Sequence, residues 1–244
     1  MKIAAISDIH GNLPALEAVL ADTERQHVDQ TINLGDILSG PLWPAETADK
    51  LMALNIPTIK GNHERQLLTL SEKQMGLTDR FTHQAISARH RAWLGSLPET
   101  LQLTQDVFAC HGAPDSDLVY LLEEIVGGAV VVAEQSVIAD RLNGCTAAVV
   151  LCGHTHIQRS VRLDTGQLII NPGSVGLPAY EDSLPTPHKV EAGTPEARYA
   201  VLEHKGGVWS ADLHSVDYDW RRAASLADER NRPDWARALR TGYC

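Results

Sequence analysis

The sequence predicts an α/β fold with a parallel sheet in its N-terminal part. Short apolar runs alternate with segments of helical spacing, an order typical of strand–helix–strand units. Residues of metal-ligand type follow several of these runs directly, as expected at the edge of an open α/β sheet. The composition is that of an ordinary globular protein, with 43% hydrophobic and 21% charged residues. At 244 residues the chain can bury a sizeable core, so we expect a single domain over residues 1–244.

The N-terminal elements are expected in the order strand, helix, strand, helix, strand, at 2–6, 13–25, 31–34, 44–54 and 56–59. Asn12 is a suitable N-cap for the first helix, because its side-chain oxygen can accept a backbone N–H. Pro14 lies in the first turn, where proline is tolerated, and Pro44 opens the second helix.

The remainder of the chain continues with helical sequence over about 64–95 and then returns to strands. The expected elements are strands at 101–104, 107–110 and 147–152, a helix at 134–142, hairpins at 159–170 and 199–213, and two closing helices at about 219–240. The stretch 177–196 contains four prolines and is predicted to be a long loop. It is interpreted either as a flap over the substrate or as a surface insertion without function.

The charge balance restricts the partners of the protein. The chain has 21 basic and 31 acidic residues, a formal net charge of −10, which repels nucleic-acid backbones and anionic lipids. No apolar run approaches the ~20 residues of a membrane helix. The N-terminus reaches Ser7 and Asp8 too soon for a signal peptide, and the four cysteines lack CxxC spacing. We therefore expect a cytoplasmic protein with reduced thiols and no polymeric nucleic-acid or membrane partner.

Candidate metal ligands follow five of the predicted strands. They are Asp8 with His10, Asp36, Asn62 followed by His63 and Glu64, His111, and His154 with His156. The carboxyl ends of parallel strands meet at one edge of a sheet, so these side chains are expected to converge. Each motif alone is a weak signal, but five in succession predict one site. Oxygen and imidazole ligands without thiolate suit Mn, Fe, Zn, Co or Ni.

These motifs resemble those of a known family. The sequences Asp8-x-His10, Gly35-Asp36, Gly61-Asn62-His63-Glu64, Cys110-His111-Gly112 and Gly153-His154-Thr155-His156 look like the five motifs of the calcineurin-like metallophosphoesterases, in the family's order. The compact length and the turn Asn171-Pro-Gly-Ser174 are most similar to the small prokaryotic phosphodiesterases, which include enzymes resembling diadenosine tetraphosphate hydrolases. The resemblance implies a four-layer αββα sandwich of two mixed β-sheets flanked by helices.

The resemblance also implies roles for the ligands. One divalent ion would take Asp8, His10 and His156, a second would take Asn62, His111 and His154, and Asp36 would bridge them, with manganese the favoured metal. The ions would acidify a bridging water that attacks phosphorus in line with the leaving oxygen. His63 would protonate the leaving group or stabilise the transition state. In related protein phosphatases an aspartate orients this histidine, but Ser39 occupies that position, which leaves Glu64 as one candidate.

Substrate contacts are expected at Asn12, Tyr120 and Ser174, each with an alternative structural role. Arg65 and Arg159 are the arginines nearest to motifs in sequence. The implied function is hydrolysis of a small-molecule phosphoester, by a phosphodiesterase or a nucleotide or dinucleoside polyphosphate hydrolase. The alternatives are a protein phosphatase acting on phosphoserine, phosphothreonine or phosphotyrosine, and a non-catalytic metal-binding scaffold of the same fold.

Overall fold

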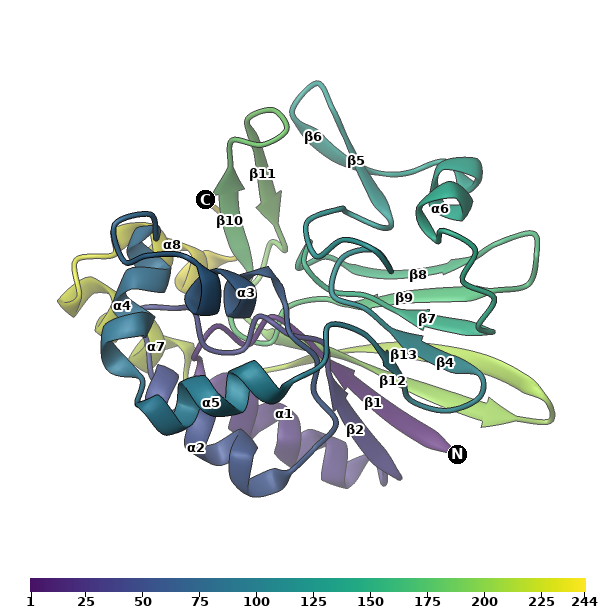
Figure 1. Ribbon diagram of the computed structural model, residues 1–244, viewed down its shortest axis with the longest axis horizontal. Helices are drawn as coiled ribbons and strands as arrows, with labels where there is room; N and C mark the ends of the chain where they lie inside the picture. The colour runs from purple at the N-terminus through teal and green to yellow at the C-terminus, as the bar shows by residue number, and fades with distance from the viewer.

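Two β-sheets pack face to face in the computed structural model, which describes residues 1–244 (Figure 1). The first sheet has the order β13-β12-β1-β2. Strand β1 (Lys2–Ile6) pairs in parallel with β2 (Gln30–Asn33) and antiparallel with β12 (Ala197–Lys205). Strand β12 continues through a tight turn into β13 (Val208–Val216), so the predicted C-terminal hairpin is confirmed.

The second sheet has the order β3-β4-β7-β9-β8 and is also mixed. Its three central strands, β4 (Val107–Ala109), β7 (Val149–Leu151) and β9 (Leu168–Pro172), run parallel to one another. The edge strands β3 (Leu101–Gln102) and β8 (Gln158–Arg162) pair antiparallel with their neighbours. The carboxyl ends of β4 and β7 therefore lie side by side, as those of β1 and β2 do in the first sheet.

The alternation of side chains along β1 explains how the layers are held together. Ile3 and Ala5 are buried between the two sheets, whereas Ala4 and Ile6 are buried against the helices outside the first sheet. Because the side-chain period of a strand is two residues, a slip of one residue would exchange these faces. On the second sheet, Val150 faces outward into a third cluster that includes residues of α6.

Helices cover the outer faces and complete the expected αββα sandwich. Helices α1 (Leu13–Arg25), α2 (Pro44–Leu54), α7 (Trp220–Glu229) and α8 (Pro233–Thr241) share a core with the first sheet. Helix α6 (Gln135–Arg141) lies on the second sheet. None of the helices combines the length and apolar character that crossing a membrane requires.

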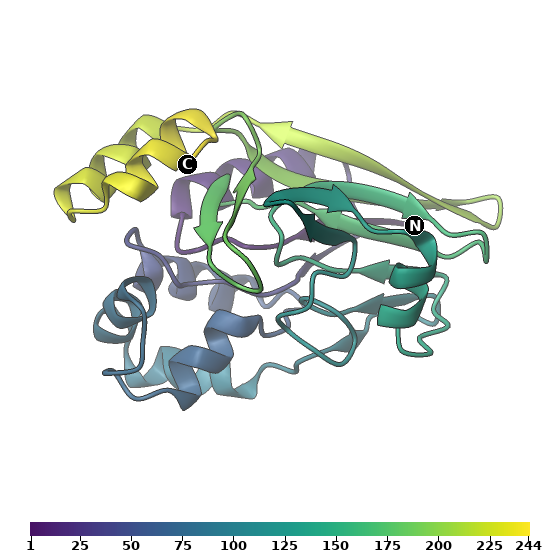
Figure 2. The same cartoon turned by 90° about the horizontal axis from the view of Figure 1, so that it is seen from above.

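The predicted helical stretch 64–95 is divided into three helices: α3 (Asn62–Thr69), α4 (Leu77–Ala85) and α5 (Ala88–Ser96). Seen from above, these helices and the α7–α8 pair lie at the same end of the molecule (Figure 2). The ends of the parallel strands therefore face an opening bordered by two groups of helices.

The strand predicted at 56–59 is wrong, because only one residue of it, Thr58, pairs with the first sheet, through Asn33. Helix α2 ends at Asn55 in the left-handed conformation, and Pro57 has no N–H to donate. Helix α3 then begins at Asn62, and between the two helices the chain makes a single bridge to the end of β2.

The loop predicted at 177–196 instead contains a hairpin of β10 (Ala179–Asp182) and β11 (His188–Glu191). Pro185 and Pro187 lie in its turn, where they remove no ladder hydrogen bond. A second hairpin, β5 (Glu123–Val126) and β6 (Ala129–Val132), was not expected. Its turn is Gly127-Gly128, both with positive φ, which is a hairpin signal that the sequence does carry.

Candidate metal centre

All the strand ends that carry candidate ligands converge on one point between the two sheets. Asp8 and His10 follow β1, Asp36 follows β2, His111 follows β4, and His154 and His156 follow β7. Their ligand atoms form two groups, each with its atoms within 4.8 Å of one another: Asp8, His10 and His156 in one, and Asp36, His111 and His154 in the other. The first group is the set expected to hold one ion; the second contains His111 and His154 of the other expected set, together with Asp36, which was expected to bridge the two.

The backbone at the site is held in an unusual conformation. Five of these residues have positive φ without being glycine: Asp8 (54°), His10 (50°), Asp36 (51°), His154 (69°) and His156 (58°). Such left-handed residues cost free energy and tend to cluster where function requires them. Gly61 lets the backbone lie close against the Asp36 side chain, because a Cβ there would collide with the carboxylate of Asp36.

Three histidines are oriented by backbone carbonyls. Nδ1 of His10 lies 2.7 Å from the carbonyl oxygen of Ser39, Nδ1 of His111 lies 2.8 Å from that of Leu34, and Nδ1 of His156 lies 2.7 Å from that of Leu177. A carbonyl accepts only, so Nδ1 of each ring carries a proton. This leaves Nε2 directed at the centre, the arrangement usual for histidines that bind a metal.

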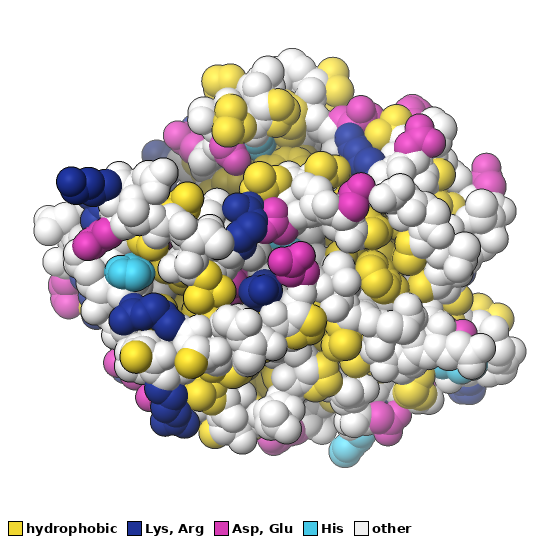
Figure 3. Space-filling model, viewed as in Figure 1, with side chains coloured by type: hydrophobic (Ala, Val, Ile, Leu, Met, Phe, Trp, Pro, Cys, Tyr) yellow, Lys and Arg dark blue, Asp and Glu magenta, His cyan; other side chains and the backbone are white.

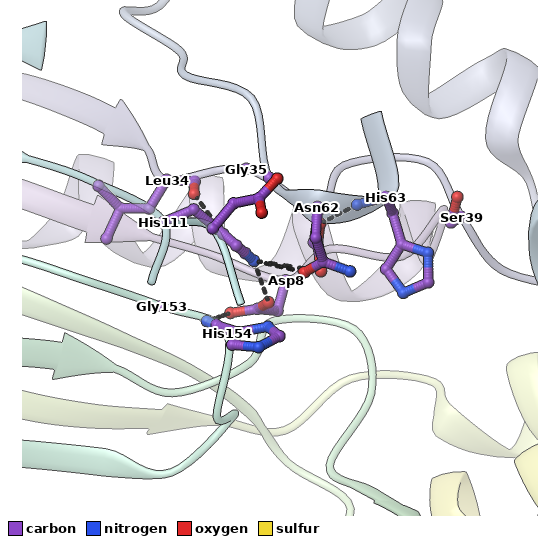
Figure 4. Close-up of polar contacts among 12 residues, drawn as sticks. Asp8, Leu34, Gly35, Ser39, Asn62, His63, His111, Gly153 and His154 are labelled. Carbon is purple, nitrogen blue, oxygen red and sulfur yellow. Dashed lines mark hydrogen bonds and ion pairs between the residues drawn. The ribbon is translucent and has the colours of Figure 1, made fainter. Parts of the chain in front are cut away.

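The ring of His154 is turned the other way, so that Nδ1 and not Nε2 faces the centre. Its Nε2 lies 3.2 Å from the carbonyl oxygen of Leu118, so Nδ1 faces inward, next to the Asn62 side chain (Figure 4). Turning the Asn62 amide over would place a donor nitrogen 3.0 Å from Nδ1 of His154 and 3.2 Å from Oδ2 of Asp36. With the amide oxygen there instead, several lone pairs converge on one point, an arrangement that a cation stabilises.

The two aspartates supply the negative charge that a cation needs. Oδ1 of Asp8 is buried without a hydrogen-bond partner and lies 3.4 Å from Nε2 of His156. Oδ2 of Asp36 lies 3.3 Å from Nε2 of His111. A buried carboxylate oxygen without a donor is costly, so its presence beside imidazole nitrogens fits a bound cation.

The pKa values of these histidines reflect both their burial and the negative charge of the two aspartates. Burial, together with the nearby His156, lowers the pKa of His10 to about 3. Burial opposes a charge on His111 as well, but Asp36 and Asp8 outweigh it and raise the pKa of His111 to about 10. A proton on Nε2 of His111 thus takes part of the role that a metal cation would fill. The donor set and its charge therefore fit divalent ions.

His63 lies beside the ligand sets but belongs to neither. Its Nδ1 lies 2.6 Å from Oδ1 of Asp79, which is buried on α4. Burial opposes ionisation of His63, yet the carboxylates of Asp36 and Asp79 raise its pKa to about 9. Asp79 is therefore the orienting partner that the sequence left open. The sequence carries no local signal for it, because it lies sixteen residues beyond His63 on a different helix.

Glu64, the candidate partner considered from the sequence, has another role. Its carboxylate accepts the backbone N–H groups of Asp36 and Ile37 at 2.8 Å and of Gly61 at 2.9 Å. It therefore fixes the turn that carries Asp36 and does not orient His63.

A cavity of about 1390 Å³ opens over the centre. His63 borders it, together with residues of α8 and of the two hairpins. Tyr120 lines it as expected, and its hydroxyl lies 2.8 Å from that of Tyr180 and 3.0 Å from Nε2 of His188. Tyr180 and Trp235 of α8, which line the cavity, and His188, which lies behind Tyr120, were not identified from the sequence, because hydrogen bonding and packing, not motifs, bring them together.

The other two expected substrate contacts have structural roles. The Asn12 side chain is fully buried, donates to the carbonyl of Gly176 at 2.9 Å and to the Tyr218 hydroxyl at 3.0 Å, and accepts from the first turn of α1. The Ser174 hydroxyl donates to the carbonyl of Asp8 at 2.8 Å. Neither residue is among those that line the cavity.

The arginines nearest to motifs in sequence are also absent from the cavity wall. Arg65 forms a two-pronged ion pair with Asp117, at 2.6 and 2.9 Å. Arg159 pairs with Glu123 at 3.3 Å. Arg141 and Arg232 line the cavity in their place.

Comparison with known proteins supplies relatives of this arrangement. The family model described as "calcineurin-like phosphoesterase superfamily domain" matches residues 1–191. An uncharacterised protein of Methanocaldococcus jannaschii is 26% identical over 247 residues, which cover 96% of this chain and 94% of the relative.

Two crystal structures match nearly the whole chain. A metallophosphoesterase from Sphaerobacter thermophilus is 26% identical, with a TM-score of 0.74 and 98% of each chain covered. A hypothetical protein from Pyrococcus horikoshii is 18% identical, with a TM-score of 0.76 and coverage of 99% of this chain and 98% of the other. The latter likeness concerns the fold alone.

Proposed function

The chain belongs to the calcineurin-like phosphoesterase superfamily and is a phosphoester hydrolase, and from this premise we propose a two-metal mechanism for it. The observation that carries the proposal is the pair of ligand groups around Asp8 and Asp36. They lie at one junction between the sheets, and Nε2 of His111 is 3.3 Å from Asp36 and 4.0 Å from Asp8. This proximity supports two ions that share ligands.

Under this proposal, one ion takes Asp8, His10 and His156, and the other takes Asn62, His111 and His154, with Asp36 bridging. The ions supply Lewis acidity and a water of lowered pKa when bound. Nitrogen and oxygen donors suit manganese, iron, zinc, cobalt or nickel. Among these metals we propose manganese.

The protein side chains supply the remaining steps. The centre binds the phosphoryl group of a small phosphoester at the base of the cavity. His63, with a pKa raised to about 9 by Asp36 and Asp79, holds a proton at neutral pH. Since Asp79 occupies Nδ1, the proton on Nε2 is the one available to the leaving oxygen. Donation there prevents the departure of an unprotonated alkoxide.

The experiment that tests this role compares leaving groups. His63→Ala should retain both metals, and turnover of an alkyl ester should fall by about 10²–10⁴-fold, the range typical of general acid catalysis. A p-nitrophenyl ester should lose much less, because p-nitrophenolate leaves without protonation. Equal losses on both esters would assign His63 to stabilising charge on the phosphoryl group, and no loss on either would assign it a structural role.

A further inference from the structure

The cavity over the centre is large enough for an extended substrate. Its volume of about 1390 Å³ exceeds the roughly 300–1,000 Å³ of most small-molecule sites. Size alone therefore admits both a dinucleoside polyphosphate and an ester with one phosphorus. The charges of the wall distinguish between these two classes.

Positive charge on the wall is scarce and already engaged. Outside the histidines, only Arg141 and Arg232 contribute cationic side chains to the lining. Arg232 makes three contacts of 2.6–3.2 Å to Asp234 and donates to Oγ1 of Thr78 at 3.0 Å. Arg141 donates to the backbone carbonyl oxygens of Tyr120 and Glu123 at 2.8 and 2.9 Å. Arg232 is therefore engaged through all three of its guanidinium nitrogens, whereas Arg141 donates through Nη1 alone.

Negative charge is more abundant on the same wall. Apart from Asp36, the lining carboxylates are Glu123, Glu124, Glu181, Asp182 and Asp234, of which Glu123, Glu181 and Asp234 are paired with basic side chains. On the face shown in Figure 3, apolar, acidic and basic side chains border the hollow beneath the β10–β11 hairpin. A polyphosphate chain leaving the metal centre would therefore pass close to carboxylates. This arrangement repels additional anionic groups.

Glu123 adds a specific buried feature to this wall. The side chain is almost completely buried, and one oxygen pairs with Arg159 at 3.3 Å. The other oxygen, Oε2, has no hydrogen-bond partner. A buried acceptor without a partner favours a ligand that brings a donor or a cation and disfavours one that brings another acceptor.

We infer that the cavity selects phosphoesters with a single phosphorus whose organic group is neutral or cationic, and that it rejects polyphosphates. The inference rests on the proposed function, since the centre must hold the one phosphoryl group. The wall then discriminates by the charge of the remainder of the substrate. This specificity differs from that of a dinucleoside polyphosphate hydrolase, which must bind several phosphates.

The test uses p-nitrophenyl phosphodiesters that differ only in the second alcohol: choline, propanol and a carboxypropyl alcohol. The leaving group is the same in all three, so kcat/KM reports the charge of the retained group. We expect the choline and propyl esters to exceed the carboxypropyl ester by about tenfold at low salt. The difference should shrink at high ionic strength, because salt screens charges near the mouth. Diadenosine tetraphosphate should be the poorest substrate of the set.

A charge variant locates the effect. Glu181 pairs with Lys189 at 2.7 Å, so Glu181→Gln removes a carboxylate and releases an ammonium group at the cavity rim. It should raise kcat/KM for the carboxypropyl ester severalfold relative to the choline ester. The matched control is Glu17→Gln, which breaks the ion pair with Lys50 on α1 and α2 and should leave the ratio unchanged.

The outcomes separate this inference from the proposed function. A carboxypropyl ester or tetraphosphate that reacts as fast as the choline ester would overturn the inference while the proposed function stands. If the metal-loaded protein hydrolyses no phosphoester, the proposed function fails. Calorimetry with the three corresponding non-hydrolysable methylphosphonates then decides the inference, since tighter binding of the choline compound supports it and equal binding refutes it.

Discussion

Nδ1 of His63 and Oδ1 of Asp79 lie 2.6 Å apart, so a residue of α3 beside the metal ligands is fixed by a residue of α4. The side chain of Asp79 is only 5% exposed, and the contact is therefore shielded from competing water. Because the pair joins two helices, it depends on how α3 and α4 pack as well as on the residues themselves.

The first prediction concerns this pair. Asp79→Asn should reduce turnover of alkyl esters by at least about tenfold and leave the metal content unchanged. The loss of the Asp79 charge lowers the pKa of His63 and so reduces the share of molecules in which His63 is protonated. Steady-state kinetics with elemental analysis measures both. Asp49→Asn is the matched control, since Asp49 pairs with His90 at 3.2 Å outside the cavity lining. Similar losses in both variants would indicate a structural role for Asp79.

The second prediction concerns Asp36. Asp36→Asn should be the most damaging single ligand change, because the proposed bridging carboxylate serves both ions. Metal content should fall below two ions per chain, and turnover should become undetectable. Asp22→Asn on α1, which removes a carboxylate bonded to Arg25 and Tyr199, should retain both ions. Normal metal content and turnover in Asp36→Asn would show that the bridging assignment is wrong.

Metal removal gives the third prediction. Exhaustive chelation should abolish hydrolysis, and Mn²⁺ should restore it best. Chelation should also lower the Tm, because ions that bind only the folded chain stabilise it by about 2.7 kcal/mol per site at 100 times Kd. Calorimetric unfolding with and without Mn²⁺ measures this shift. Hydrolysis by protein shown to be metal-free would eliminate the two-metal proposal.

The fourth prediction concerns pH and Glu123. Burial raises the pKa of Glu123 to about 7, although Arg159 works in the opposite direction. A carboxyl with a raised pKa in the folded state favours folding fully below its unfolded pKa of about 4.5 and loses that contribution as pH rises through about 7. The loss amounts to about 3 kcal/mol.

Glu123→Gln should abolish this part of the pH dependence. Urea unfolding at pH 5 and pH 8 should show a smaller decline for the variant than for the natural chain. Glu124→Gln, which changes the partly exposed neighbour, should decline as the natural chain does. Parallel declines for Glu123→Gln and the natural chain would mean that Glu123 is not the group responsible.

Much of the metal centre was predictable because its residues follow strands directly. Asp8, Asp36 and His111 each come after an apolar run, and parallel strands bring such positions to one edge. Asp79 was not predictable in this way, because the packing of α4 brings it to His63. His188 was hidden for another reason: the prolines around it suggested a loop, whereas they occupy only the turn of a hairpin.

The fold was predictable where hydrophobic period and capping agreed, as in α1 after Asn12. It was not predictable at 56–59, where the apolar run suits a strand but only Thr58 pairs with the sheet. The β5–β6 hairpin shows the reverse case, because the sequence does carry a turn signal for it at Gly127-Gly128.

The carbonyl groups that hold His10, His111 and His156 belong to the main chain of Ser39, Leu34 and Leu177. Every amino acid supplies the same carbonyl, so a substitution at these three positions leaves the acceptor in place. An insertion or deletion beside them moves it and lets the imidazole turn. The positions of these acceptors therefore depend on loop length and on the packing of the buried Leu34 and Leu177, and not on which functional group their side chains carry. Related sequences should therefore conserve the number of residues between these positions and the histidines more strictly than the amino-acid types at the positions themselves.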